Sequence, residues 1–325
     1  MSRSFFQQIL LAATSVHLTS AALADEPEFT RTTYVYKTVG DLDVHADVYR
    51  APGDEPRPVL VMIHGGALML GNREGIDRRV RDAMLAAGFV VVSIDYRLAP
   101  ETQLPEIIAD VEDAFAWLRK DGTRLFQADV DNVVVTGGSA GGYLTLTAGH
   151  RVRPRPRALV AFFGYGDLVG DWYSTPSPHP RHHRSQLTPD EAWKQVSGPP
   201  LADSRDRPGD GGAFYQFCRQ TGGWPKAVSG WDPHSEADRF APYMPLRNVD
   251  GDYPPTLLIH GTADTDVPYE QSVLMDRELQ AHGVTHRLIT IEGAEHGLVD
   301  GDSAAIDAAY DAVPQFFLHH TASSR

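Results

Sequence analysis

The sequence predicts an α/β protein with a mostly parallel central sheet flanked by helices. Short continuous apolar runs at 58–66 and 89–96 are typical of strands buried on both faces. Helix-like stretches separate these runs, and strands alternating with helices favour right-handed crossovers between parallel neighbours. A length of 325 residues suits one large domain with an insertion, or two small domains.

The expected elements follow one another in a regular order from about Thr32. An antiparallel hairpin opens the fold, because "TTYVYKT" and "LDVHADVYR" alternate apolar and polar residues. The remaining strands are expected at 58–66, 89–96, 130–138, 157–164, 255–261 and 286–293. Helices are expected at 74–87, from Pro105 to the Asp121-Gly122 pair, from Ser139 to about His150, near 268–282 and from about Ser303 to His320.

A long segment, about 167–252, interrupts this alternation. It is rich in proline, glycine and aromatic residues, and its better helical candidates are 188–196 and roughly 212–220. A bare loop of this length does not fit a compact domain, and a disordered linker would not carry so many large aromatic rings. The segment is therefore predicted to be a cap, inserted between the sixth strand and the next. The aromatic residues expected to be buried in it are Trp172, Tyr173, Phe214, Tyr215, Phe217, Trp224, Trp231 and Tyr243.

The net charge limits which partners the protein is expected to bind, and the cysteine content limits its disulfides and metal sites. Lys and Arg number 29 against 43 Asp and Glu, which gives a formal net charge of −14. An acidic surface repels nucleic acid and anionic membranes, so we expect a small-molecule substrate, no nucleic acid and no stable membrane anchor. Cys218 is the only cysteine, which excludes an intramolecular disulfide and a thiolate metal site.

Residues 1–24 are predicted to be a secretory signal peptide. Arg3 lies near the start, no acidic residue occurs before Asp25, and Ala22-Leu23-Ala24 fits a small-x-small cleavage site. Cleavage near Ala24 would export residues 25–325 to the periplasm or the medium. An amphipathic N-terminal helix of the folded domain is the alternative.

The segment "VVVTGGSAGG" places Ser139 among four glycines, directly after a predicted strand and before a predicted helix. A phosphate loop would need a lysine after its glycines, and the dinucleotide pattern G-x-G-x-x-G is not met. Gly137 to Gly141 do match G-x-S-x-G in the strand–turn–helix context of a nucleophile elbow. Ser139 is therefore the candidate nucleophile, and a plain glycine-rich turn is the alternative.

A serine hydroxyl needs a base, and the base needs a carboxylate to orient it. Asp264 follows the strand "PTLLIHG", and His296 follows the strand "HRLITIEG", so both come after Ser139 in the order acid, then histidine. These residues are expected at the same sheet edge as Ser139. Asp264 is the preferred acid because it follows its strand by a short turn, and Asp266 is the alternative.

The segment "HGGA" at 64–67 follows the buried run "VLVMI". Glycines let the backbone approach a developing oxyanion closely, so the backbone N–H groups of Gly66, Ala67 and Ala140 are the expected oxyanion hole. His64 is expected to brace this loop rather than to transfer protons.

Taken in order, "HGG", "DYRLAPE", "GGSAGG", "HGTADTDVP" and "EHG" resemble the esterase/lipase branch of the α/β-hydrolase superfamily, close to hormone-sensitive-lipase-like carboxylesterases. The resemblance covers roughly 32–166 and 253–320, and it departs from the family pattern where the usual third glycine of the oxyanion loop is Ala67. It implies an α/β-hydrolase fold and ester hydrolysis through an acyl-enzyme by Ser139, Asp264 and His296, without a cofactor or metal.

Neutral esters with short to medium acyl chains are the expected substrates. A prolyl-oligopeptidase-like peptidase or amidase with the same three residues is the alternative enzyme, and a non-catalytic binding module is a third possibility. The segment "HPRHH" at 179–183 contains three histidines, but it lies in a proline-rich stretch, so a solvated loop is expected there instead of a metal site.

Overall fold

The computed structural model describes residues 28–321. Its eight-stranded sheet has the order β1-β2-β4-β3-β5-β6-β7-β8. The β1 and β2 pairings are antiparallel, and all pairings from β4 to β8 are parallel. The strands are β1 (Thr30–Val39), β2 (Leu42–Arg50), β3 (Arg57–Ile63), β4 (Val90–Ile94), β5 (Ala128–Gly138), β6 (Leu159–Phe162), β7 (Thr256–Gly261) and β8 (His286–Ile291). The predicted fold class is therefore confirmed, and the predicted signal peptide at 1–24 lies outside the described residues.

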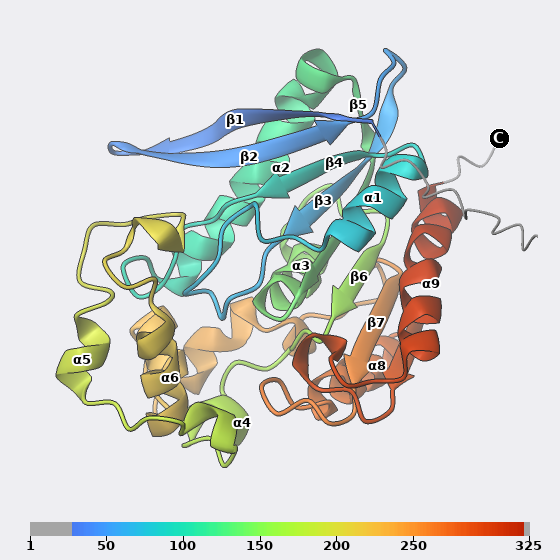
Figure 1. Ribbon diagram of the computed structural model, residues 1–325. Helices are drawn as coiled ribbons and strands as arrows, with labels where there is room; N and C mark the ends of the chain where they lie inside the picture. The colour runs from blue at the N-terminus through green and yellow to red at the C-terminus, as the bar shows by residue number, and fades with distance from the viewer. Residues whose placement is uncertain (1–27, 322–325) are drawn as a thin grey trace, which may run out of the picture.

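Helices cover both faces of the sheet (Figure 1). One apolar cluster packs α1 and α9 against one face, and a second packs α2, α3 and α8 against the other. The bounds of these helices are α1 (Arg78–Ala86), α2 (Leu104–Phe126), α3 (Ala140–Arg151), α8 (Glu270–Ala281) and α9 (Ser303–Thr321). None of the helices within 28–321 is long and apolar enough to span a bilayer.

Two helix boundaries differ from the sequence prediction. Helix α1 starts at Arg78 instead of residue 74, because the Asp77 side chain accepts a hydrogen bond from the Val80 N–H and caps the first turn. Helix α2 continues past Asp121-Gly122 to Phe126. Gly122 lies inside the helix, and the residue that ends it is Gln127, which adopts the left-handed conformation with φ 50° and ψ 44°.

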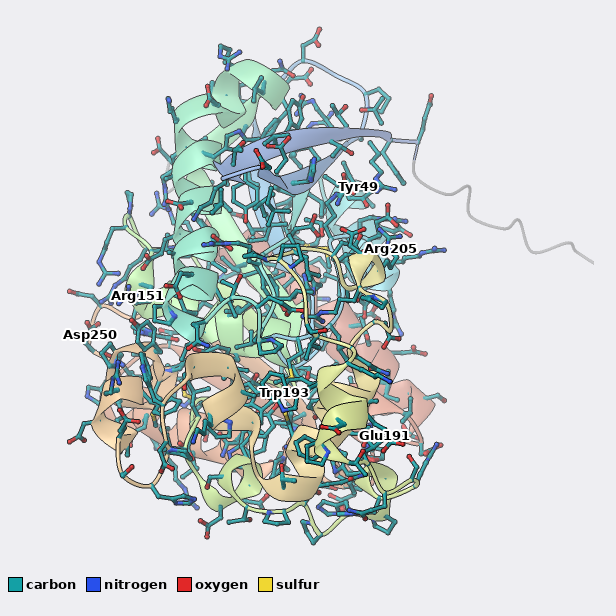
Figure 2. The ribbon with its side chains drawn as sticks, turned by 90° about the vertical axis from the view of Figure 1, so that its left-hand side faces the viewer. Tyr49, Arg151, Glu191, Trp193, Arg205 and Asp250 are labelled. Carbon is teal, nitrogen blue, oxygen red and sulfur yellow. The ribbon has the colours of Figure 1, made fainter. Side chains whose placement is uncertain are left out.

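The insertion leaves the sheet after β6 and returns at β7, as predicted. Figure 2 shows Glu191 and Trp193 of its helix α5 in the lower part of the molecule, away from Tyr49 of the opening hairpin. Its regular elements are α4 (Asp171–Ser174), η1 (Pro180–His182), α5 (Pro189–Trp193), η2 (Ser204–Asp206), α6 (Gly212–Thr221), α7 (Trp224–Ser229), η3 (Ala237–Tyr243) and η4 (Pro245–Arg247). Helices α5 and α6 fall within or close to the predicted ranges.

The aromatic residues of the insertion form a packed cluster. Tyr173, Phe214 and Trp224 are buried, and the other predicted aromatics are half-buried. Tyr173 stacks on Trp224 with 4.0 Å between ring centroids, and Trp172 stacks on the other side of Tyr173 at 3.7 Å. Aromatic burial of this kind stabilises a segment that has little regular secondary structure.

Candidate active site

Ser139 occupies a strained turn between β5 and α3. Its φ and ψ are 57° and −121°, a region that residues with a side chain rarely adopt. The turn requires glycines on both sides, because a Cβ at Gly137 or Gly141 would come within 2.5 Å of a backbone oxygen. Ser139 therefore has the backbone geometry expected of a nucleophile elbow.

Asp264 lies in the loop after β7, and both of its carboxylate oxygens are occupied. Oδ1 accepts hydrogen bonds of 2.8 Å from the N–H groups of Asp266 and Val267. Oδ2 lies 2.7 Å from His296 Nδ1 and 3.2 Å from Nε2 of the buried His260. Burial opposes ionisation, but the hydrogen bonds from the two imidazoles outweigh it and hold the pKa of Asp264 at about 2.

His296 lies in the loop after β8, between two carboxylates. Asp264 contacts its Nδ1, and Asp266 Oδ2 lies 3.7 Å from its Nε2. Burial lowers the pKa of His296, but the hydrogen bond to Asp264 and the charges of both aspartates outweigh this and raise it above its usual value. Of the two predicted acids, Asp264 is the one placed to orient the ring from Nδ1.

Phe163, the residue after β6, lies between the serine and histidine sides of the site. Its ring packs edge-on against His296 with 4.9 Å between centroids, and it also lies beside Gly138. Within 28–321, no hydrogen bond joins Ser139 Oγ to His296. Catalytic hydrogen bonds of this kind are often long without substrate and shorten in the complex.

Asp266 forms a second polar network that the sequence analysis missed. Its Oδ1 accepts hydrogen bonds from Tyr215 Oη at 2.6 Å and His182 Nε2 at 2.9 Å. Burial opposes its ionisation, but the His182 hydrogen bond and nearby positive charge hold the pKa of Asp266 well below its usual value. Spacing gave no signal for this network, because Tyr215 and His182 come from the insertion.

The expectation of a solvated "HPRHH" loop is wrong for His182, which is buried. His182 Nδ1 bonds Ser177 Oγ at 2.7 Å, so both ring nitrogens have partners inside the protein. Burial lowers its pKa. Across 28–321, no group of three or more His, Cys, Asp or Glu side chains is arranged to hold a metal ion.

The predicted oxyanion loop follows β3 and has three consecutive residues with positive φ, Gly66 at 105°, Ala67 at 55° and Leu68 at 61°. A Cβ at Gly66 would lie 2.2 Å from Leu70 O, so this position requires glycine. The N–H groups of Gly66 and Ala67 donate to no acceptor within 28–321. Ala140 is the first residue of α3, where backbone N–H groups have no partner inside the helix. Trp224 Nε1 holds the loop by donating to Ala67 O at 2.9 Å.

His64 braces this loop. It is buried, stacks on the Tyr96 ring with 4.2 Å between centroids, and bonds Gly65 O through Nδ1 at 2.8 Å. Burial lowers the pKa of His64 to about 4, so the ring is neutral at neutral pH. This arrangement agrees with a bracing role.

Glu295 is a further residue that the sequence analysis did not single out. It accepts hydrogen bonds from the Thr265 N–H at 2.7 Å and from the His296 N–H at 3.0 Å. It therefore ties the loop carrying His296 to the loop carrying Asp264. The only sequence signal was an acidic residue directly before His296 in "EHG".

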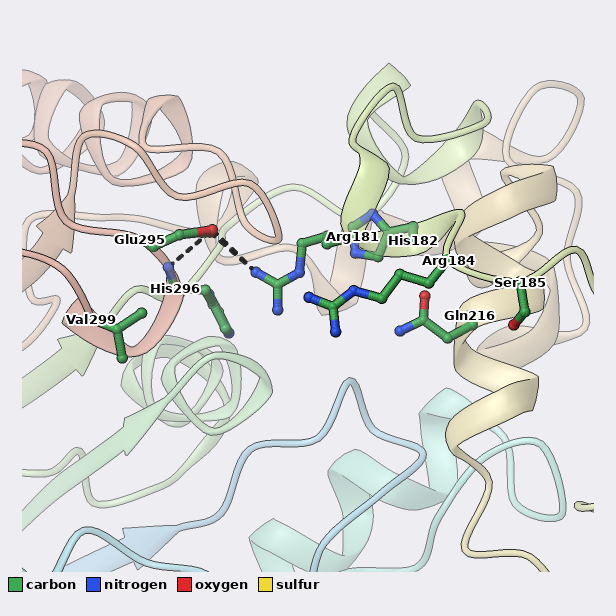
Figure 3. A pocket seen from close by; sticks show the side chains of 8 residues that line it. All are labelled: Arg181, His182, Arg184, Ser185, Gln216, Glu295, His296 and Val299. Carbon is green, nitrogen blue, oxygen red and sulfur yellow. Dashed lines mark hydrogen bonds and ion pairs between the residues drawn. The ribbon is translucent and has the colours of Figure 1, made fainter.

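Two separate cavities are lined by the predicted nucleophile, Ser139, and the predicted base, His296. Ser139 lines an apolar cavity of about 220 Å³ on the α1 side, with walls that include Ile76, Val80 and Phe162. His296 lines a larger, more polar cavity of about 440 Å³, together with residues of the insertion such as Arg181 and Gln216 (Figure 3). The site therefore has an apolar cavity on the Ser139 side and a more polar cavity on the His296 side.

A family model described as alpha/beta hydrolase fold matches residues 60–300. The chain belongs to the α/β-hydrolase fold family. The predicted superfamily is thereby confirmed, and family membership supports a hydrolase. Among curated proteins, a non-reducing polyketide synthase of Preussia isomera is 30% identical over 86% of this chain, and one of Penicillium rubens is 29% identical over 81%. The aligned regions cover only 14% and 12% of those synthases.

Solved structures share the α/β-hydrolase fold at low sequence identity. A Staphylococcus aureus protein described as of unknown function has a TM-score of 0.72 and 22% identity, covering 89% of this chain and 99% of its own. A carbohydrate esterase from gut microbiota has a TM-score of 0.66 and 21% identity, covering 92% and 98%. Esterase 2 of Thermogutta terrifontis, phosphoramylated by tabun, has a TM-score of 0.62 and 21% identity, covering 89% and 94%.

Proposed function

We propose that the protein is a serine hydrolase that cleaves carboxylic esters through an acyl-enzyme. The main support is the 2.7 Å contact between His296 Nδ1 and the ionised Asp264, in loops that follow neighbouring strands of the sheet that also carries Ser139. A carboxylate on Nδ1 fixes the tautomer in which Nε2 is free to accept a proton. The esterases among the structural neighbours agree with this proposal.

In the proposed reaction, Ser139 Oγ attacks the ester carbonyl carbon while His296 Nε2 takes the hydroxyl proton. The N–H groups of Gly66, Ala67 and Ala140 stabilise the resulting oxyanion. Collapse of this intermediate breaks the bond to the alcohol, which leaves with the proton from His296. Water then attacks the acyl-serine with the same histidine as base, and this step releases the acid and restores Ser139.

The cavity at Ser139 is proposed to bind the acyl group. Its volume of about 220 Å³ and its apolar walls suit an uncharged chain of short to medium length. Discrimination between neighbouring chain lengths should be modest, because one methylene in an apolar pocket is worth only about 1–3 kcal/mol. A sharp optimum at one length is therefore not expected.

The test is a panel of p-nitrophenyl esters of graded acyl length, assayed beside proline-directed peptide amides. The butyrate ester should be cleaved faster than the palmitate ester, and the amides should be nearly inert. Ser139→Ala should lower ester turnover by roughly a thousandfold or more, and a fluorophosphonate probe should label Ser139 alone. Faster amide cleavage would favour the peptidase, and near-normal turnover in Ser139→Ala would refute serine catalysis.

A further inference from the structure

The cavity beside His296 has a cationic lining. Arg181 and Arg184 enter it from the insertion, and Gln216 enters it from α6. Figure 3 shows both guanidinium groups lying between His296 and the Gln216 amide. These two arginines place positive charge beside the candidate histidine in a chain whose formal net charge is −14.

The two arginines differ in how their charges are compensated. Arg181 Nη1 lies 3.1 Å from Glu295 Oε1, and its Nη2 lies 3.8 Å from Asp266 Oδ2. Arg184 is exposed and has no carboxylate within 4.0 Å among residues 28–321. The cavity lining of two arginines and one glutamate therefore keeps one uncompensated positive charge, at Arg184.

Gln216 is a second group without a partner. Its Oε1 is buried and makes no hydrogen bond within 28–321. A buried polar atom without a partner is costly, and most such atoms in proteins are paired. The unpaired Oε1 needs a donor, which a carboxylate does not supply, but the Gln216 amide lines the cavity and its NH2 can donate to an anion held next to Arg184.

The proposed chemistry determines which part of an ester reaches this cavity. His296 gives its proton to the departing alcohol oxygen, so the alcohol part leaves on the His296 side. The acyl group is assigned to the apolar cavity at Ser139. The alcohol part of a bound ester would therefore extend toward Arg184 and Gln216.

We propose that this cavity binds a carboxylate on the alcohol part of the substrate, so that the enzyme hydrolyses O-acyl esters of hydroxy acids. The inference rests on the proposed esterase function and adds the substrate class. A guanidinium matches a carboxylate well, since two parallel N–H groups can bond its two oxygens. The acyl part of the proposed substrate remains uncharged. Only the alcohol part differs from the neutral ester expected from the sequence, because it carries a carboxylate.

The experiment compares 4-(butyryloxy)phenylacetate with 4-(butyryloxy)phenylacetamide. The two esters have the same acyl group, and a methylene separates the carboxylate or amide from the phenol, which keeps the leaving groups similar. The native enzyme should show a kcat/KM about tenfold higher for the carboxylate, mainly through a lower KM, as expected for one charge-assisted contact. Added salt should reduce this ratio.

Arg184→Gln should bring the ratio of the two esters close to one, and Arg184→Glu should reverse it. Arg247→Gln is the matched control, because Arg247 is also exposed and has no carboxylate partner within 28–321, but it does not line this cavity. The control should keep the native ratio and activity. A native preference for the amide, or a ratio that Arg184→Gln leaves unchanged, would overturn the proposal.

Product binding separates this proposal from the proposed esterase function. Calorimetry with 4-hydroxyphenylacetate should show binding to the native protein that weakens about tenfold in Arg184→Gln, as expected for loss of one charged contact. Binding without cleavage of either ester would support the carboxylate site and refute the esterase. Cleavage of the amide ester without binding of the carboxylate product would refute the carboxylate site and support the esterase.

Discussion

Replacing Asp266 by Asn should shift the pH profile of the enzyme without removing its activity. The carboxylate lies 3.7 Å from His296 Nε2, where it stabilises the protonated imidazole. At this separation, a unit charge pair is worth roughly 1 kcal/mol in water and roughly 4 kcal/mol at an effective dielectric constant of about 20. Asp266 is 12% and His296 16% exposed, so some screening by water is expected.

A change of one pH unit corresponds to about 1.4 kcal/mol, so the water limit gives a shift of roughly one pH unit. Removing the negative charge lowers the pKa of His296, and the neutral base then persists to lower pH. The acid limb of kcat/KM should therefore move to lower pH by about that amount. Asn keeps an oxygen for Tyr215 and His182, so the network around Asp266 is retained.

The assay is kcat/KM for p-nitrophenyl butyrate between about pH 5 and 9, followed at the isosbestic wavelength of nitrophenol. Asp264→Asn is the comparison, because it removes the carboxylate on Nδ1 and should lower kcat by roughly ten-thousandfold. An unmoved acid limb in Asp266→Asn, together with a loss as large as that of Asp264→Asn, would refute these roles for the two aspartates.

Three further outcomes are expected. Gly66→Ala should lower both the melting temperature and kcat, since its Cβ would clash with Leu70 O, whereas Gly283→Ala, at a positive φ with open space around it, should cost stability alone. Trp224→Phe loses the hydrogen bond to Ala67 O and replaces a buried indole by a smaller ring, so kcat should fall and the free energy of unfolding should drop by at least about 1–3 kcal/mol. Activity should be unaffected by EDTA, and strong inhibition by the chelator would instead indicate a metal-dependent reaction.

The sequence predicted the sheet well because buried parallel strands leave a strong local pattern. The runs that became β3 and β4 are almost entirely apolar, and each contains five consecutive buried residues. The end of α2 was wrong for a non-local reason. Asp121-Gly122 has the composition of a helix end, but the buried face of α2 continues through Leu118, Gly122 and Phe126. Packing of this face against the sheet extends the helix past the local stop signal.

In the candidate site, too, some positions could be predicted from the sequence and others could not. The positions of Ser139, Asp264 and His296 at one edge of the sheet could be predicted because all three follow strand ends, and strand ends can be predicted. Asp266 lies in one of the same loops, but its partners Tyr215 and His182 come from an insertion with little periodicity. Contacts between such a segment and the sheet depend on side-chain packing across the chain, which sequence spacing does not encode.

The insertion is joined to the site by contacts that resist opening. Arg207 from the insertion is buried, with its Nη2 2.6 Å from the buried Glu101 and 2.7 Å from Ala99 O. Separating the insertion from the loop after β4 would break this buried ion pair and its hydrogen bonds, and each hydrogen bond to a charged group contributes about 1.5–3 kcal/mol. Trp224 would also lose its contact with Ala67. A lid that swings away as one body is therefore disfavoured, and substrate entry through the exposed Arg184 side of the His296 cavity requires neither contact to break.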